Sequence, residues 1–227
     1  MNKKNFIITI DGPAGSGKTT IAKILSAKLN FLLLESGSLY RTVTYLWLKC
    51  PQPLNEFLKN LKKFFEQEIK IKLLPSGTNI YLGNKLLKDE LKSKEVEDKV
   101  SEISTIKEVR FFLTEFMRNL INKKNNKNLI AEGRDMGNVV FPEADLKIFL
   151  TAKEEIRVQR RYKEIIDREK RELSYEEVLN NIKFRDKLDS ERSIAPLIIP
   201  DGAYVIDTSY LTPEQIIEKI LQKLKEK

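Results

Sequence analysis

The sequence predicts a parallel α/β fold built around a phosphate-binding loop. A short apolar run at 6–10 leads into a glycine-rich turn at 12–17, and helical spacing of apolar residues follows from Ile21. A second apolar run at 32–34 precedes another helical pattern around Val43. Strand, helix, strand and helix in this order are typical of a parallel sheet that is covered by helices.

The middle of the chain interrupts this rhythm. Residues 54–65 have helical spacing, whereas 69–74 and 79–82 alternate like strands, and Leu86 and Leu87 start a possible third strand. Gly-containing turns separate these runs. We therefore interpret residues 60–92, with bounds uncertain by about 2–4 residues, as an inserted subdomain that contains β-structure.

The second half of the chain returns to alternating strands and helices. Apolar runs predict strands at 129–131, 146–150 and 204–206, and the polar run 122–128 predicts a loop. Four capping boxes, each a Ser or Thr three residues before a Glu or Gln, predict helix starts. The pairs are Thr105 and Glu108, Thr151 and Glu154, Ser174 and Glu177, and Thr212 and Gln215.

Composition narrows the chemistry and the location. The net charge is +8, but basic and acidic residues are interleaved, so solvated helix faces explain the charge better than a nucleic-acid patch. The chain has no histidine, which excludes Ser–His and Cys–His nucleophiles and His-ligated zinc. Cys50 is the only cysteine, and no apolar run is long enough for a signal peptide or a membrane span. We expect a cytoplasmic protein without a membrane or nucleic-acid partner.

The glycine-rich turn carries the strongest signal. It fits G-x-x-x-x-G-K-[ST] with a strand before and a helix after, so its N–H groups and the helix N-terminus can bind a phosphate. Lys18 adds a positive charge for the β- and γ-phosphates, and the Thr19 hydroxyl can bind Mg²⁺. GTPases, helicases and kinases share this motif, so it predicts a nucleotide and not a reaction. The expected ATP-binding residues are Gly12, Pro13, Ala14, Gly15, Ser16, Gly17, Lys18, Thr19 and Thr20.

Polar residues follow the second and third strands, at the sheet edge where open α/β sheets bind ligands. After the second strand, Arg41 suits another phosphate group, although a surface arginine is the alternative, and Ser36 can equally be a helix cap. After the third strand, Glu132 can order the water shell of Mg²⁺, and Arg134 can clamp a transferring phosphoryl group. Asp135 can accept from a base amino group or hold an arginine. The alternative for this segment is a loop ion pair.

Two later helices carry arginines with helical spacing. Arg157, Arg160 and Arg161 share a face, where their repulsion favours an anion, so we expect a lid over the ATP phosphates. The alternative is a solvated helix that pairs with its own glutamates. On the next helix, Arg185, Asp189 and Arg192 could hold a phosphate and sugar hydroxyls, or form surface ion pairs.

Together these segments resemble bacterial cytidylate kinases. The matching stretches are ITIDGPAGSGKTT, ESGSLYR, AEGRDMGNVVFPEADLKIFLTA, RVQRRYKE, DSERSIAPL and VIDTSYL, in order from residue 7 to 211. The resemblance implies one P-loop NTPase domain over 1–227, with a five-stranded parallel sheet flanked by helices. It also implies a monophosphate-binding region at 36–122 that contains the β-insert, and a lid at 157–172.

The resemblance implies a monomer that transfers phosphate from ATP to CMP or dCMP with Mg²⁺. It places a catalytic role on Lys18, Arg134, Arg160 and Arg161, ATP contact on Arg157, and the metal on Thr19 and, through water, Glu132. It places the acceptor on Ser36, Arg41, Ser101, Arg110, Arg134, Asp135, Arg185, Asp189 and Arg192. Of these, Ser101, Arg110 and Asp135 read the cytosine; by pattern alone Ser101 and Arg110 are ordinary helix-surface residues.

Two positions depart from the family pattern. Leu188 replaces an expected arginine, which puts one phosphate or lid contact in question, and Glu35 stands where Asp is common. The nearest alternative is a related kinase of UMP, AMP or another small acceptor. An ATP-responsive RNA-interacting protein is a more distant one, because no RNA-binding motif is found.

Overall fold

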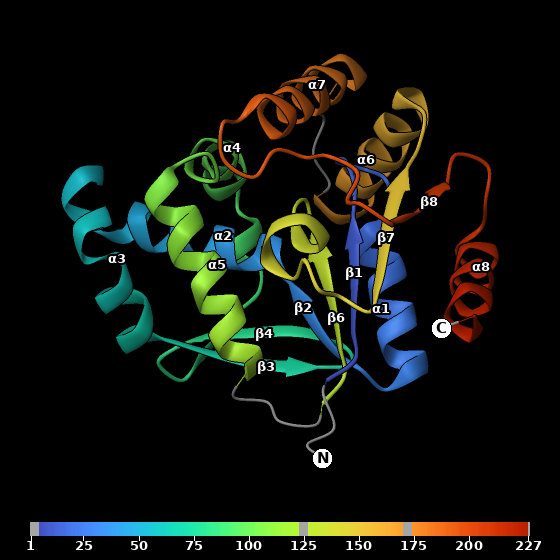
Figure 1. The fold of residues 1–227 in the computed structure, drawn as a ribbon. Coiled ribbons are helices and arrows are strands. Elements are labelled where there is room, and N and C mark those ends of the chain that lie inside the picture. The colour runs from blue at the N-terminus through green and yellow to red at the C-terminus, as the bar shows by residue number, and fades with distance from the viewer. Residues whose placement is uncertain (1–4, 123–126, 170–173, 227) are drawn as a thin grey trace.

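The computed structural model describes residues 5–122, 127–169 and 174–226. Its centre is a five-stranded parallel sheet with the strand order β2-β6-β1-β7-β8. The strands are β1 (Ile7–Asp11), β2 (Leu32–Glu35), β6 (Leu129–Gly133), β7 (Leu146–Thr151) and β8 (Tyr204–Asp207). The predicted parallel α/β fold is confirmed, and β1 lies in the middle of the sheet (Figure 1).

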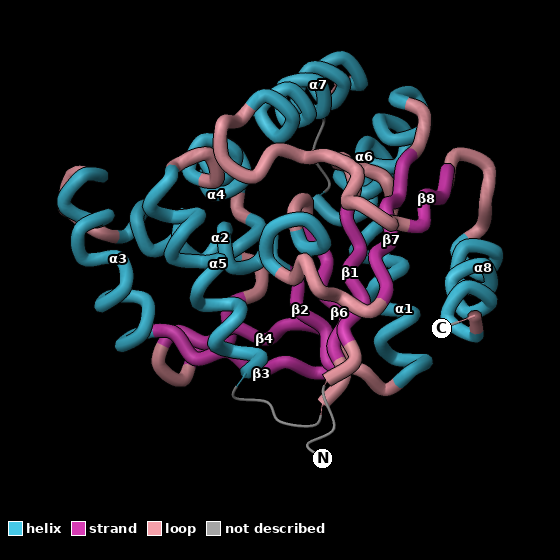
Figure 2. The backbone as a smooth tube through the Cα atoms, viewed as in Figure 1, coloured by secondary structure: helices cyan, strands magenta, loops and turns pink. Residues whose placement is uncertain are grey.

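Helices cover both faces of this sheet (Figures 1 and 2). On one face, apolar residues of the sheet pack with α1 (Lys18–Leu29) and α8 (Pro213–Lys225) into one core. On the other, a larger core joins the sheet to α2 (Ser36–Lys49), α3 (Leu54–Glu68), α4 (Lys94–Ile103) and α5 (Lys107–Asn122). Burial on both faces explains why the sheet strands are continuous apolar runs in the sequence.

The predicted β-structure in the middle of the chain is an antiparallel sheet of three strands. These strands are β3 (Ile69–Leu74), β4 (Gly77–Leu82) and β5 (Lys85–Leu87). It is fastened to β2 by reciprocal bonds: the Thr78 N–H donates to Glu35 Oε2 at 2.9 Å, and the Glu35 N–H donates to Thr78 Oγ1 at 2.8 Å. Glu35, where the family pattern has Asp, thus fastens the small sheet to the large one.

Two further helices, α6 (Glu154–Glu169) and α7 (Tyr175–Glu191), lie over the carboxyl end of the central sheet (Figure 1). They pack on each other through a small core of their own, which includes Val158 and Ile182. A short 3₁₀ helix and a π-helix complete the described elements, at Glu90–Lys92 and Met136–Val140. No helix within the described ranges is both long enough and apolar enough to cross a bilayer.

Two of the four predicted capping boxes form, and two do not. Ser174 and Thr212 cap α7 and α8 as predicted. Thr151 is instead the last residue of β7, and α6 begins at Glu154 itself. Helix α5 begins at Lys107, and the Thr105 hydroxyl donates 2.7 Å to the carbonyl of Glu102 in the turn before it. In both cases the threonine belongs to, or bonds with, the element before the predicted helix: Thr151 with β7 and Thr105 with α4.

Candidate functional site

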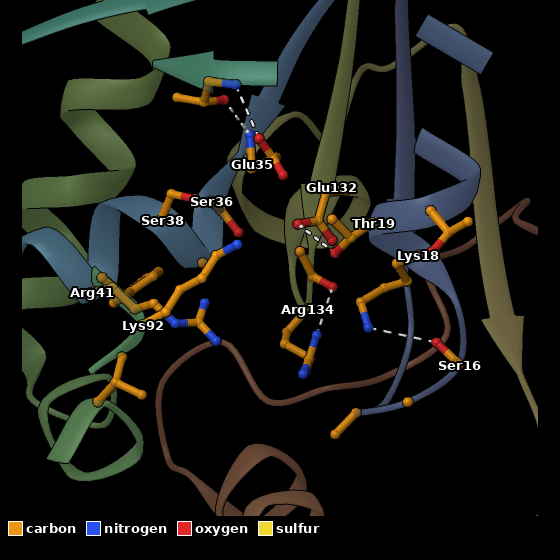
Figure 3. A pocket seen from close by; sticks show the side chains of 18 of the residues that line it. Ser16, Lys18, Thr19, Glu35, Ser36, Ser38, Arg41, Lys92, Glu132 and Arg134 are labelled. Carbon is orange, nitrogen blue, oxygen red and sulfur yellow. Dashed lines mark hydrogen bonds between the residues drawn. The ribbon is translucent and has the colours of Figure 1, made fainter. Parts of the chain in front are cut away.

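A cleft of about 970 Å³ opens at the carboxyl end of the central sheet. One wall is the phosphate-binding loop with the start of α1, and the opposite wall comes from α2, α4 and α5. Helices α6 and α7 contribute the third side. Figure 3 shows the two walls facing each other, with Lys18 on one and Arg41 on the other. Most of the predicted site residues therefore share one cavity.

The phosphate-binding loop has the backbone that its glycines allow. Gly15 and Gly17 adopt φ of 73° and 90°, in the left-handed region that residues with side chains rarely occupy. A Cβ on Gly12 would stand 2.0 Å from the carbonyl oxygen of Leu150, so only glycine fits beside β7. Gly12 and Pro13 lie outside the cleft lining, whereas all residues from Ala14 to Thr20 line the cavity.

Lys18 is folded back onto the loop that precedes it. Its Nζ donates to the carbonyl of Pro13 at 2.7 Å and to Ser16 Oγ at 3.5 Å. Burial, and next the positive charge of Arg134, lower the pKa of Lys18 to about 7. A buried ammonium of this kind gains strongly from a nearby phosphate, which restores its charged form.

Thr19 and Glu132, the two residues expected at the metal, come together beside Lys18. The Thr19 hydroxyl donates to Glu132 Oε1 at 3.3 Å (Figure 3). Burial raises the pKa of Glu132, and the nearby Lys18 opposes this rise. Hard oxygen ligands of this kind suit Mg²⁺, which keeps waters and phosphate oxygens as its other ligands. The described residues contain no cluster of three acidic side chains that would hold a metal without a substrate.

Arginines from three separate segments gather around the cleft. Arg41, Arg134 and Arg185 all line the cavity. Burial, and next the positive charges of Arg41 and Arg134, lower the pKa of Arg185 to about 10. Burial likewise lowers the pKa of Arg41. Such a cluster is costly until an anion arrives, so it is suited to bind a second phosphate group. Ser36, at the start of α2, lies on the same wall as Arg41 and is buried.

Arg110 and Asp135 form a buried ion pair at the end of this wall. Arg110 Nη2 lies 2.5 Å from Asp135 Oδ2, and the two side chains are 2% and 3% exposed. Arg110 also donates to the carbonyl of Ser104 at 2.9 Å and stacks 5.5 Å above the ring of Tyr40. The helix-surface interpretation of Arg110 is therefore wrong. Ser101 is half-buried and lines the same cavity.

Asp189 connects the arginine cluster to the rest of α7. It accepts from Arg134 Nε at 2.8 Å and from Arg192 Nη1 at 3.1 Å. Arg192 also donates from Nε to the carbonyl of Ala195 at 2.7 Å. The ion pairs of the alternative interpretation are thus present, but they line the cleft and are largely buried, not on the surface. Leu188 is half-buried on α7 and lies outside the cleft lining.

The three arginines of α6 separate. Arg161 donates to Glu97 of α4 at 2.9 Å and to Glu164 at 3.0 Å. Arg160 donates to the hydroxyl and the carbonyl of Thr208, at 2.9 and 2.5 Å. Both line the cleft, whereas Arg157 lies outside its lining, behind the phosphate-binding loop. The part of the expected lid at 170–172 lies outside the described residues.

Three residues around the site were missed by sequence reasoning. Asp11 accepts from the N–H groups of Met136 and Gly137, at 2.8 and 2.7 Å, and fixes the loop after β6. Thr208 bonds to the carbonyls of Ser16 and Thr151, at 3.1 and 3.0 Å. Asp186 pairs with Arg157. Only Asp11, which directly precedes the glycine-rich turn, had a local signal in the sequence.

Comparisons with known proteins agree on one family. A family model described as cytidylate kinase matches residues 8–226. The chain is 41% identical to the cytidylate kinase of Carboxydothermus hydrogenoformans, over 95% of either chain. It is also 41% identical to that of Fervidobacterium nodosum, over 97% of this chain and 96% of the relative. An uncharacterized protein from Eubacterium ventriosum shares the fold, with a TM-score of 0.53 at 13% identity, covering 98% of this chain and 100% of that one.

Proposed function

The chain belongs to the cytidylate kinase family and is an ATP-dependent kinase, and we propose that it phosphorylates CMP and dCMP in the cleft described above. One observation carries this proposal. The phosphate-binding loop with Lys18 and the cluster of Arg41, Arg134 and Arg185 line a single cavity, with Lys18 and Arg41 on facing walls. Two phosphate-binding walls around one space are what a transfer from one nucleotide to another requires.

The reaction that we propose needs positioning more than acid–base chemistry. The acceptor phosphate oxygen is already ionised near neutral pH, which agrees with a chain that has no histidine. Lys18 and the loop N–H groups hold the ATP phosphates, and the arginine cluster brings the acceptor into line. Arg160 and Arg161 stabilise the transferring group and help to exclude water, which would otherwise hydrolyse ATP.

Mg²⁺ belongs on the ATP side of the cleft in this proposal. Thr19 would bind it directly and Glu132 through water, since their oxygens lie 3.3 Å apart beside Lys18. The ion supplies charge neutralisation for the phosphates of ATP when it is bound. Lys18 then approaches the same phosphates from the loop side.

The Arg110–Asp135 pair supports cytosine as the base. One oxygen of Asp135 is held by Arg110, so the carboxylate is fixed in place and remains able to accept a further hydrogen bond. Cytosine carries an exocyclic amino donor where uracil carries a carbonyl. We infer that this carboxylate accepts from the amino group and that Ser101 contacts the same base.

The remaining features of the proposal concern organisation. We propose that residues 36–122 form the acceptor-binding region and that α6 begins a lid at residue 157. The absence of a cysteine pair and of a long apolar run supports a cytoplasmic protein. A monomer without a nucleic-acid partner remains a prediction.

Removal of the Lys18 ammonium tests the ATP side. We expect Lys18→Ala to lower kcat/KM at least ~100-fold, because the group stabilises charge on the transferring phosphate. Lys28→Ala removes an exposed lysine at the end of the same helix and serves as the control. Near-normal turnover by Lys18→Ala would overturn the assignment of this wall.

A further inference from the structure

The outer side of the phosphate-binding loop is packed directly against α6. A Cβ added to Gly15 would lie 2.7 Å from the carbonyl oxygen of Arg157 and 2.9 Å from the Arg157 Cβ. The loop backbone therefore touches the lid helix itself, and the position of α6 and the shape of the loop depend on each other.

Arg157 makes this contact specific. Its Nη1 donates to the carbonyl of Ala14 at 3.1 Å, and its Nε donates to the carbonyl of Ala152 at 3.1 Å. The residue is 7% exposed, so its charge is almost fully removed from water. A guanidinium this deeply buried needs a counter-charge.

Asp186 on α7 supplies that counter-charge and a second contact. Its Oδ2 is ion-paired with Arg157 Nη1, and its Oδ1 accepts from the N–H of Ala14 at 3.4 Å. The pair of side chains thus binds both the N–H and the carbonyl of one residue of the loop. The peptide groups on both sides of Ala14 are held in a fixed orientation in this way.

Helix α7 also faces the acceptor. Arg185 and Asp189, on either side of Asp186 in sequence, line the cleft, whereas Asp186 points away toward the loop. One helix therefore contacts both substrate walls through neighbouring residues. A shift of α7 would act on the backbone of Ala14 through Asp186, whose Oδ1 accepts from the Ala14 N–H.

We propose that Asp186 is a positioning residue for ATP, acting through Arg157 and Ala14 and without touching the nucleotide. This inference rests on the proposed function for its choice of substrates. The carboxylate sets the loop conformation that receives the phosphates. Loss of the carboxylate weakens binding of ATP and ADP and leaves the acceptor site intact.

Substitution of Asp186 tests the proposal. Asp186→Ala removes both contacts, and Asp186→Asn keeps an acceptor for Ala14 but removes the charge that balances Arg157. We expect about a tenfold rise in the KM for ATP and in the Kd for Mg·ADP with Asp186→Ala, as loss of a charge-assisted bond predicts. The KM for CMP should stay within about twofold of the wild-type value. The KM for ATP and the Kd for Mg·ADP of Asp186→Asn should lie between those of the wild type and of Asp186→Ala.

Glu191→Gln is the matched control, because it removes an exposed carboxylate from the same helix. A tenfold effect on ADP affinity that spares CMP, with partial rescue by Asn, supports the positioning role. Wild-type ADP affinity in both variants, or equal losses for ADP and CMP, overturns it. If Asp186→Ala fails to fold, Asp186→Asn alone tests the proposal. A rise of about threefold in its Kd for ADP, with CMP affinity unchanged, supports the positioning role, and an unchanged Kd for ADP overturns it.

Calorimetric binding of Mg·ADP needs neither an acceptor nor turnover. A wild-type protein that binds ADP but shows no CMP-dependent turnover would refute the proposed function, and the comparison of ADP affinities would still test Asp186.

Discussion

Separation of the Arg110–Asp135 pair should cost both stability and acceptor binding. The two charges lie 2.5 Å apart with side chains only 2% and 3% exposed, so neither can turn to water if the other is lost. Removal of one partner from such a pair costs about 3–5 kcal/mol, because a charge is left buried without compensation. That is a large part of the ~5–15 kcal/mol that separates the folded from the unfolded state of an ordinary domain.

The assay is a double-mutant cycle in urea with Arg110→Met, Asp135→Asn and the combined variant. We expect each single substitution to lower the free energy of unfolding by about 3 kcal/mol or more, and the double variant to lose less than the sum. The KM for CMP should rise in all three variants. Lys107→Met, which removes an exposed charge from the same helix, is the control.

Additive losses, or single losses under about 1 kcal/mol, would refute the reasoning, because they would mean that the pair is solvated or mobile. Intact CMP binding in Asp135→Asn would separately contradict the role of this carboxylate in base recognition. The stability and binding measurements can therefore fail independently.

Three further predictions follow from the site. Since the pKa of Lys18 is lowered to about 7, ATP binding at pH 8 should take up close to one proton, and calorimetry in buffers of different ionisation enthalpy should detect it; equal heats after correction would contradict this. Burial raises the pKa of Asp11 to about 6, so the folded state holds its proton at higher pH than the unfolded state. The wild type should then lose about 2 kcal/mol relative to Asp11→Asn between pH 4 and pH 6, and parallel stability profiles would disprove it. Thr208→Val should cost about 1–3 kcal/mol in urea and raise the KM for ATP, because Arg160 and the Ser16 carbonyl lose a buried partner; unchanged stability would show that these bonds contribute little.

Local sequence patterns predicted the central fold well. Local sequence is enough to specify the strand before Gly12, the glycine-rich turn and the helix from Lys18. Residues close together in the chain determine each of these segments, so the sequence pattern alone predicts them. The same holds for the capping boxes at Ser174 and Thr212, where residues three apart satisfy each other. The β-insert was visible because its strands alternate and are joined by short turns.

Tertiary contacts decided the positions that the patterns missed. Thr151 pairs with Asp207 in the sheet, and its carbonyl accepts from the Thr208 N–H. Thr151 is therefore part of the strand and does not cap α6. Helical spacing also put Arg157 on the lid face with Arg160. Only the packing of α6 against the glycine-rich loop turns Arg157 away from the cleft.

Long-range contacts have no local signature at all. Asp186 meets Ala14 across 172 positions of the chain, and the Thr208 hydroxyl meets Ser16 across 192. In the sequence both are ordinary polar residues. Arg110 similarly has the spacing of a helix surface, and the fold buries it against Asp135 and Tyr40.

The most direct test of the central claim is the rate of ADP release by the purified protein with Mg·ATP and CMP, dCMP, UMP, AMP or no acceptor. The proposed function predicts strong stimulation by CMP and dCMP over the rate without acceptor, with UMP and AMP weaker. Preference for UMP or AMP would contradict the reading of Ser101, Arg110 and Asp135 as the cytosine site. No stimulation by any acceptor would contradict the kinase function and leave only a nucleotide-binding loop.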